Sequence, residues 1–453
     1  MKSLRNWVVS LFAMLFAAMT MVHAQSSNLD KILENLNRYD VKVQGSSNAQ
    51  LWLERARAYY EAESSITKDL AEGIDYAVVQ VAMGRSNSSQ EVKIGGTVYI
   101  EHQYPLVKVY VTKADNIVRG WISSLLSTGH NFCGTALASY QRAAELDASL
   151  NDAIAKELNL LENYYVVGGN AAYAIGGKLY ASYYYMMAFN VQVSPSYKGG
   201  VNHDYLMAVP QMMIEDEVDE NSREMAITAL EALMELDYHD GGNVDFYLAY
   251  FYLMQYNDDN LNETLWKALE VACKGVNIYS KNADLIEAAT TLFTMVDVSE
   301  VPAKNISKLK QWADMLLRYN PEDASLWINR GAIYLSMDNY EEAIVSFTKT
   351  LELDSQDADI WNMVGYCYYV LANRVLDEEV YSALTDEDYY NASKNCDNLC
   401  MKSLYYYEGA FNLGCRDIEV IENLRVISYR LRDKDGMMAK YEKYRKLCEE
   451  LKK

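Results

Sequence analysis

The sequence is poor in proline, histidine and positive charge. Its 453 residues include five prolines and five histidines, and 41 Lys and Arg stand against 63 Asp and Glu, a net charge of −22. So few prolines suit long helices, since proline breaks a helix interior. Nucleic acids and anionic membranes attract basic surfaces, so this charge argues against both as partners. It favours a basic peptide or protein as partner, although a charged, solvated surface would also account for it.

The chain also lacks the usual catalytic and metal-binding signatures. There is no His-Glu-x-x-His pair, no Gly-x-Ser-x-Gly elbow and no phosphate-binding Gly-x-x-x-x-Gly-Lys-Ser/Thr loop. Such motifs place a nucleophile, a metal or a phosphate beside the groups that activate it. Their absence predicts a protein without a catalytic site, cofactor or metal.

Cysteine is scarce and its state is left open by the sequence. Seven cysteines cannot all pair within one chain. Cys396 and Cys400 are four residues apart, a spacing that shares a helix face but is usually too wide for a disulfide. Buried thiols and a disulfide within this region both remain compatible with the pattern.

Long apolar runs are confined to the first 24 residues. Lys2 and Arg5 precede an apolar stretch at 7–22, which ends in Val22-His23-Ala24. This order is typical of a secretory signal cleaved before Gln25. No later run is long enough to span a membrane. We therefore expect an exported protein, periplasmic or alternatively secreted, with no membrane span after cleavage.

A repeat of 34 residues dominates the last third of the chain. Residues 324–357 read ASLWINRGAIYLSMDNYEEAIVSFTKTLELDSQD, and the pattern begins again at Ala358. Trp327, Gly331 and Tyr334 recur 34 residues later, and their i, i+4, i+7 spacing marks one helix face. A fixed period of this length predicts stacked helix–turn–helix units that share one core.

These residues resemble the tetratricopeptide (TPR) repeat family. Trp327, Gly331, Tyr334, Ala343 and Phe347 match the family order, while Arg330 replaces the family leucine. The resemblance implies an all-α, superhelical array of helix pairs. It also implies a non-enzymatic scaffold that binds a peptide or protein in a groove lined by the first helix of each pair.

Fainter copies and two interruptions suggest the organisation of the remainder. Residues 50–60 (QLWLERARAYY) look like a first helix whose partner appears only at 134–146. Between them, Val-, Ile- and Tyr-rich runs separated by turn residues predict a small three-stranded antiparallel meander at about 91–122. The predicted segments are a signal peptide at 1–24, an interrupted first pair at 25–147, degenerate pairs at 148–320, and clear repeats at 321–453 with an insertion at about 372–400.

The family resemblance places candidate groove residues on two first helices. Counted along each repeat, the groove positions hold Asp359, Asn362, Tyr366, Tyr369, Glu419, Glu422, Tyr429 and Arg430. This surface, with its tyrosines and carboxylates, suits a polar or basic peptide in the cell envelope. The alternative is an enzyme or small-ligand module carried by the inserted β segment, where Glu101, His102 and Lys108 are polar.

The predicted signal peptide can be tested directly. N-terminal sequencing of the exported protein should begin at Gln25, because the cleavage site follows the small side chain of Ala24. An exported product that retains Met1 would contradict this interpretation.

Overall fold

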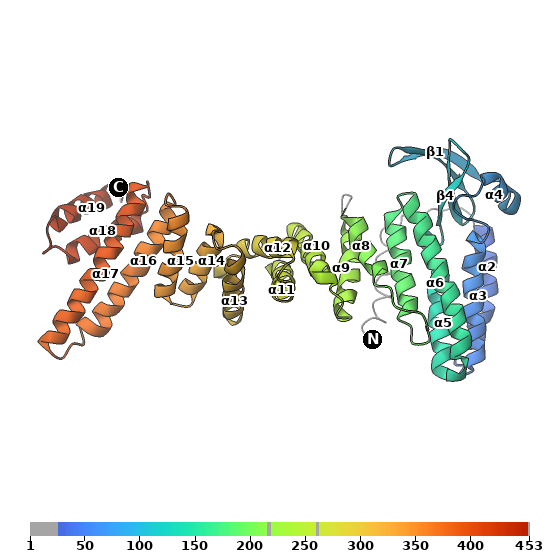
Figure 1. Ribbon diagram of the computed structural model, residues 1–453, viewed down its shortest axis with the longest axis horizontal. Helices are drawn as coiled ribbons and strands as arrows, with labels where there is room; N and C mark the ends of the chain where they lie inside the picture. The colour runs from blue at the N-terminus through green and yellow to red at the C-terminus, as the bar shows by residue number, and fades with distance from the viewer. Residues whose placement is uncertain (1–25, 215–218, 260–261, 452–453) are drawn as a thin grey trace. The chain divides into compact units, whose positions relative to one another are not determined.

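The computed structural model describes residues 26–214, 219–259 and 262–451, so the predicted signal peptide lies outside the described residues. The chain divides near residue 260 into two compact units. Helices build both units, and the first also carries a small sheet (Figure 1).

The first unit is a series of antiparallel helices with a sheet inserted near its start. Helix α3 packs against α5, α6 against α7, and α8 against α9. The elements are α2 Ser26–Val43, α3 Ala49–Thr67, α4 Tyr76–Met83, β1 Ser88–Ile94, β2 Thr97–Gln103, β3 Val107–Thr112, β4 Val118–Ser123, α5 Phe132–Leu146, α6 Asn151–Ala174, α7 Lys178–Gln192, α8 Asp204–Met213, α9 Glu220–Glu235 and α10 Asn243–Asp259.

The second unit consists of helices joined by turns, and none of its described residues forms a strand. Successive helices pack against one another from α11 to α19. They are α11 Asn262–Ile278, α12 Ala283–Thr294, α13 Ala303–Tyr319, α14 Ala324–Ser336, α15 Tyr340–Leu353, α16 Ala358–Val375, α17 Asp386–Asn412, α18 Ile418–Arg430 and α19 Met437–Leu451. Helices α14 and α15 are the pair predicted from the clear repeat, and Gly331 lets α14 approach the ring of Phe347 on α15.

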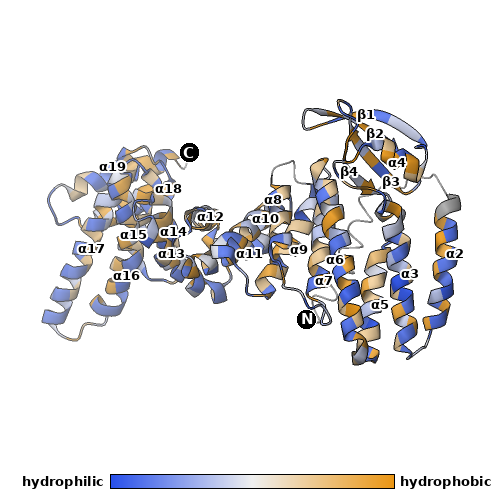
Figure 2. Ribbon diagram, turned by 45° about the vertical axis from the view of Figure 1, so that its right-hand side comes forward, coloured by the Kyte–Doolittle hydropathy of each residue, from blue (hydrophilic) through white to orange (hydrophobic). Residues whose placement is uncertain are grey.

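The inserted sheet has four antiparallel strands in the order β1-β2-β3-β4, so the prediction of three strands was wrong. Strand β1 pairs with β2 along its whole length, from Ser88 opposite Gln103 to Ile94 opposite Thr97. Its first four residues are exposed and polar, and Figure 2 shows β1 as hydrophilic beside the apolar central strands. The polar first half of β1 lacks the apolar alternation by which strands are predicted, whereas Val92 and Ile94 in its second half pack against a buried apolar cluster.

A glycine allows strand β4 to pack closely against α6. Gly120 on β4 lies so close to α6 that a Cβ atom there would stand 2.0 Å from the carbonyl oxygen of Ala171. Tyr76 and Val79 of α4 pack against Trp121 and other buried residues of the strands. The insertion is therefore packed onto the first unit.

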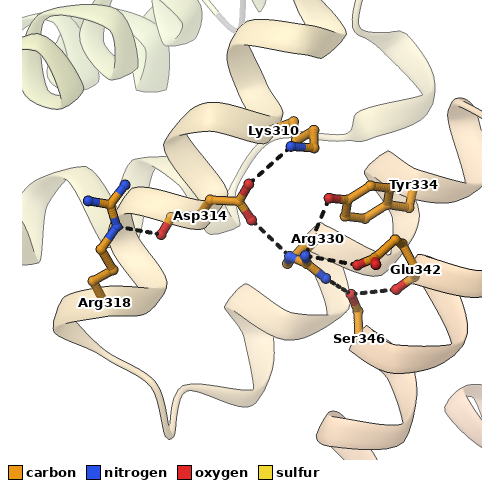
Figure 3. Close-up of polar contacts among 7 residues, drawn as sticks. All are labelled: Lys310, Asp314, Arg318, Arg330, Tyr334, Glu342 and Ser346. Atoms are coloured by element: carbon orange, nitrogen blue, oxygen red, sulfur yellow. Dashed lines mark hydrogen bonds and ion pairs between the residues drawn. The ribbon is translucent and has the colours of Figure 1, made fainter.

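Arg330 of α14 joins three consecutive helices (Figure 3). Its Nε donates to Asp314 Oδ1 of α13 at 2.9 Å, and its Nη1 donates to Ser346 Oγ of α15 at 2.7 Å. The guanidinium lies 4.6 Å from the ring centroid of Tyr334 and forms a 3.1 Å ion pair with Glu342. We call a guanidinium bonded to an Asp of the preceding helix and a Ser of the helix that pairs with its own a three-helix arginine bridge.

The same bridge recurs in the first unit around Arg55 of α3. Its Nε donates to Asp40 of α2 at 2.7 Å, and its Nη1 donates to Ser139 of α5 at 2.5 Å. Its guanidinium lies 4.7 Å from the ring centroid of Tyr59. Both bridging arginines occur in the motif Trp-x-x-Arg-Ala/Gly-x-x-Tyr. Helices α3 and α5 therefore pack as α14 and α15 do, despite the insertion between them.

The bridge predicts an ordered pair of substitutions at Arg330. Its side chain is 13% exposed while that of Asp314 is 35% exposed, so Arg330→Ala should cost about 2–3 kcal/mol, below the range for a fully buried pair. Arg330→Leu restores the family residue and should cost about half as much, because the leucine fills the space between the helices. Urea denaturation measures both changes. Equal losses for Ala and Leu would show that packing does not compensate for the bridge.

Glu63 of α3 is a buried carboxylate in the first unit, with 3% exposure. It accepts the backbone N–H of Cys133 at 2.7 Å, at the start of α5, and the Tyr164 hydroxyl at 3.3 Å. Burial raises the pKa of Glu63, and these hydrogen bonds oppose the rise. The folded state therefore favours the protonated form more strongly than the unfolded state does.

The sign of this shift predicts a pH dependence. Stability from protonated Glu63 is fully present below the ordinary pKa of 4.5 and is lost as pH rises through the raised folded pKa. Glu63→Gln keeps an acceptor for Cys133 without the charge, so its stability relative to wild type should increase with pH above about 4.5. Thermal unfolding at several pH values measures the difference. Glu61→Gln, on the exposed side of α3, is the control, and a parallel response of both variants would contradict the prediction.

Candidate functional site

Helix α16 has a packed side and an open side. Its packed side meets α17, where Ser403 Oγ donates to the carbonyl oxygen of Gly365 at 2.7 Å and the Tyr407 ring leaves no room for a side chain at Gly365. Trp361 anchors the start of the helix by donating its Nε1–H to the carbonyl oxygen of Ser355 at 2.9 Å. This packing orients the opposite side of α16 away from α17.

The predicted groove residues of α16 differ in accessibility. Asp359 is exposed and Asn362 is partly buried. Tyr366 keeps 45% exposure, with its ring edge-on to Tyr340 of α15 at 6.4 Å. Tyr369 instead packs against the core formed by α17, α18 and α19. Tyr366 is thus available to a partner, whereas Tyr369 mainly supports the fold.

The predicted groove residues of α18 divide in the same way. Glu419 is exposed, and Glu422 is partly buried. Tyr429 keeps 49% exposure and contacts the Tyr441 ring of α19 at 5.1 Å. Arg430 turns toward α17, where its Nε lies 3.9 Å from Asp397 Oδ1. The guanidinium of Arg430 is therefore engaged within the fold.

Two further side chains on these helices are open to solvent. Met363 of α16 is 41% exposed and Val426 of α18 is 39% exposed. Neither is among the groove residues named from the sequence, and Met363 follows Asn362 directly without any sequence signal of its own. We define the first-helix surface as Asp359, Met363 and Tyr366 of α16 with Glu419, Val426 and Tyr429 of α18.

The first-helix surface combines apolar area with negative charge. Tyrosine supplies a rigid ring and a hydroxyl, which makes it a frequent contact in protein interfaces. The two carboxylates of Asp359 and Glu419 attract basic groups and repel acidic ones. This chemistry suits binding, because no nucleophile lies beside a base on this surface.

The inserted sheet does not assemble a comparable open site around its polar residues. Glu101 is 7% exposed and accepts from Gln90 at 2.9 Å and Tyr110 at 2.8 Å, with Lys108 at 3.3 Å. His102 stacks on the ring of Tyr76 at 3.9 Å and shares a hydrogen bond with Ser89. Burial lowers the pKa of His102. The polar strand residues Glu101, His102 and Lys108 are therefore engaged in contacts within the insertion itself.

The described residues contain neither a metal-binding group nor a helix suited to a membrane. Within 26–214, 219–259 and 262–451, no three His, Cys, Asp or Glu side chains gather as ligands. No helix over the same ranges has the length and apolarity to cross a bilayer. All seven cysteines are unpaired thiols, and six of them are buried.

Comparison with known proteins identifies the repeat. A family model of the tetratricopeptide repeat matches residues 324–357. This helix pair is therefore similar to a tetratricopeptide repeat. The match covers helices α14 and α15, and no curated protein matches the chain. The repeat supports a role as a scaffold for protein–protein interaction.

Solved structures of tetratricopeptide repeat proteins are among those that match. The crystal structure of MamA is 15% identical, covers 47% of this chain and 91% of its own, and has a TM-score of 0.30. YrrB, described as a TPR protein with an unusual peptide-binding site, is 15% identical, with 49% and 92% coverage and a TM-score of 0.31. TTC0263, a thermophilic TPR protein of Thermus thermophilus, is 13% identical, with 51% and 99% coverage and a TM-score of 0.24. These TM-scores are too low to support an inference about this chain.

Proposed function

We propose that the protein is a non-enzymatic adaptor of the cell envelope that binds a peptide or protein segment on its first-helix surface. The observation that carries the proposal is the exposure of Tyr366 and Tyr429, at 45% and 49%, on first helices of two neighbouring repeats. Exposed tyrosines that share one surface are frequent anchors of protein interfaces.

The charge of the surface narrows the class of partner. Asp359 and Glu419 flank the exposed tyrosines, and Arg430, the basic residue predicted there, faces Asp397 instead. The surface is therefore more acidic than the sequence alone indicates. A segment with lysine or arginine beside an apolar residue would satisfy both features. Envelope localisation rests on the signal-like segment at 1–24.

Site-specific photocrosslinking tests the surface and captures whichever protein occupies it. A benzophenone amino acid replaces Tyr366 or Tyr429 in the full chain, expressed in cells that export it. Both positions should crosslink to the same protein, since they belong to one binding surface. Tyr405 of α17 is a matched control, because it is 61% exposed but lies outside the first-helix surface.

The crosslinked partner then permits an affinity measurement. Tyr366→Ala and Tyr429→Ala should each weaken binding by about 2 kcal/mol, the loss typical of an aromatic hot spot. Tyr405→Ala should change affinity by less than about 0.5 kcal/mol. Calorimetry on the three variants measures these values. A loss confined to Tyr405→Ala would place the binding surface on α17 instead.

A further inference from the structure

Helices α16 and α17 extend beyond the part of each helix that packs as a repeat. Residues Leu376–Val380 continue α16 as a π-helix, in which the N–H of Tyr381 donates to the carbonyl oxygen of Leu376 at 3.1 Å. Helix α17 then begins at Asp386 and runs for 27 residues. A π-helical turn is rare and occurs often at functional sites. We call residues 376–390 the acidic tip.

The acidic tip exposes four large apolar side chains within fifteen residues. Leu384 is 96% exposed, which is close to complete solvation of a leucine. The other three are Tyr381 at 73%, Tyr389 at 56% and Tyr390 at 65%. Single exposed apolar residues are common on protein surfaces, but a group of this kind marks a contact surface.

The charge of the tip is of one sign. No lysine or arginine occurs between Arg374 and Lys394, while six carboxylates do: Asp377, Glu378, Glu379, Asp386, Glu387 and Asp388. Thr385 caps α17 by accepting the N–H of Asp388 at 3.1 Å. None of the six forms an ion pair with another described residue. The negative charge of the tip is therefore not neutralised within the fold.

Helix stability explains only half of these carboxylates. Negative charge at residues 386–388 is favourable, because the N-terminus of a helix carries partial positive charge. Asp377, Glu378 and Glu379 stand at the opposite pole, in the last turn of the α16 extension, where the same dipole is unfavourable to them. Departures from local stability of this kind are expected at functional sites.

We infer that the acidic tip is a docking site for a basic, partly apolar segment of another protein. Lysine or arginine side chains of that segment would neutralise the carboxylates, and its apolar residues would cover Leu384 and the exposed tyrosines. A second copy of this chain is a poor occupant, since each copy carries a net charge of −22. This inference concerns a surface separate from the first-helix surface and holds whether or not that surface binds.

Fluorescence anisotropy with the full chain and a defined probe tests the inference. The probe is a labelled 14-residue peptide of lysine, leucine and alanine, and its counterpart has glutamate in place of lysine. Two variants alter the tip: Glu378→Gln with Glu379→Gln, and Leu384→Ser with Tyr389→Ser. Each should weaken binding of the lysine peptide by about ten-fold or more. The glutamate peptide should not bind.

Matched substitutions elsewhere separate a site from general attraction to an acidic protein. Asp69→Asn with Glu72→Gln changes net charge equally at exposed positions of the first unit. Val81→Ser with Tyr173→Ser removes exposed apolar side chains of 88% and 49% exposure. Both controls should stay within about two-fold of wild type.

Three outcomes would overturn the inference. They are wild-type affinity in both tip variants, equal losses in tip and control variants, and sedimentation showing that the tip joins two copies of the chain. Circular dichroism verifies that each variant is folded. Tyr366→Ala, measured with the same peptide, should leave binding at the tip unchanged, so failure of the tip and failure of the first-helix surface give different results.

Discussion

In each helical unit, the guanidinium group of a partly buried arginine ties three helices together. In each unit it occupies the family's leucine position and bonds an aspartate of the preceding helix and a serine of the helix that pairs with its own. A leucine there would contribute packing without direction. The planar, five-donor guanidinium also fixes the rotation of three helices about their axes, because its bonds form only at one relative orientation.

The repeat from Ala358 shows what replaces the bridge when the arginine is absent. Val364 takes the arginine position, and Tyr406 stands where the serine would be. Tyr406 stacks with Tyr368 at 5.7 Å and contacts Trp361 at 5.4 Å. Apolar and aromatic packing thus substitutes for directional bonding. Where the arginine is replaced, the serine is replaced as well, as expected of two side chains in direct contact.

Helices α14 and α15 could be predicted from sequence because period, turn residues and packing residues all agreed there. The start of β1, residues 88–90, could not, since its residues are all polar, and α8 could not, since Pro210 lies within it. The groove positions followed from the repeat register alone. The solvent exposure of Tyr369 and Arg430 depends on neighbouring helices. Tyr369 packs against the core that includes α17, and Arg430 lies beside Asp397 of α17. Sequence register supplies a helix face, while tertiary neighbours decide which side chains on it remain accessible.

The insertion between α3 and α5 has a consequence for the entropy of the chain. The matching turn between α14 and α15 spans residues 337–339, whereas α3 and α5 are joined through residues 68–131. For a flexible connection, closing the longer loop would cost roughly 3 kcal/mol more. A folded sheet removes most of that freedom, and its strand β4 packs closely against α6 at Gly120. The sheet thereby acts as a rigid spacer that lets two distant segments pair as if they were adjacent.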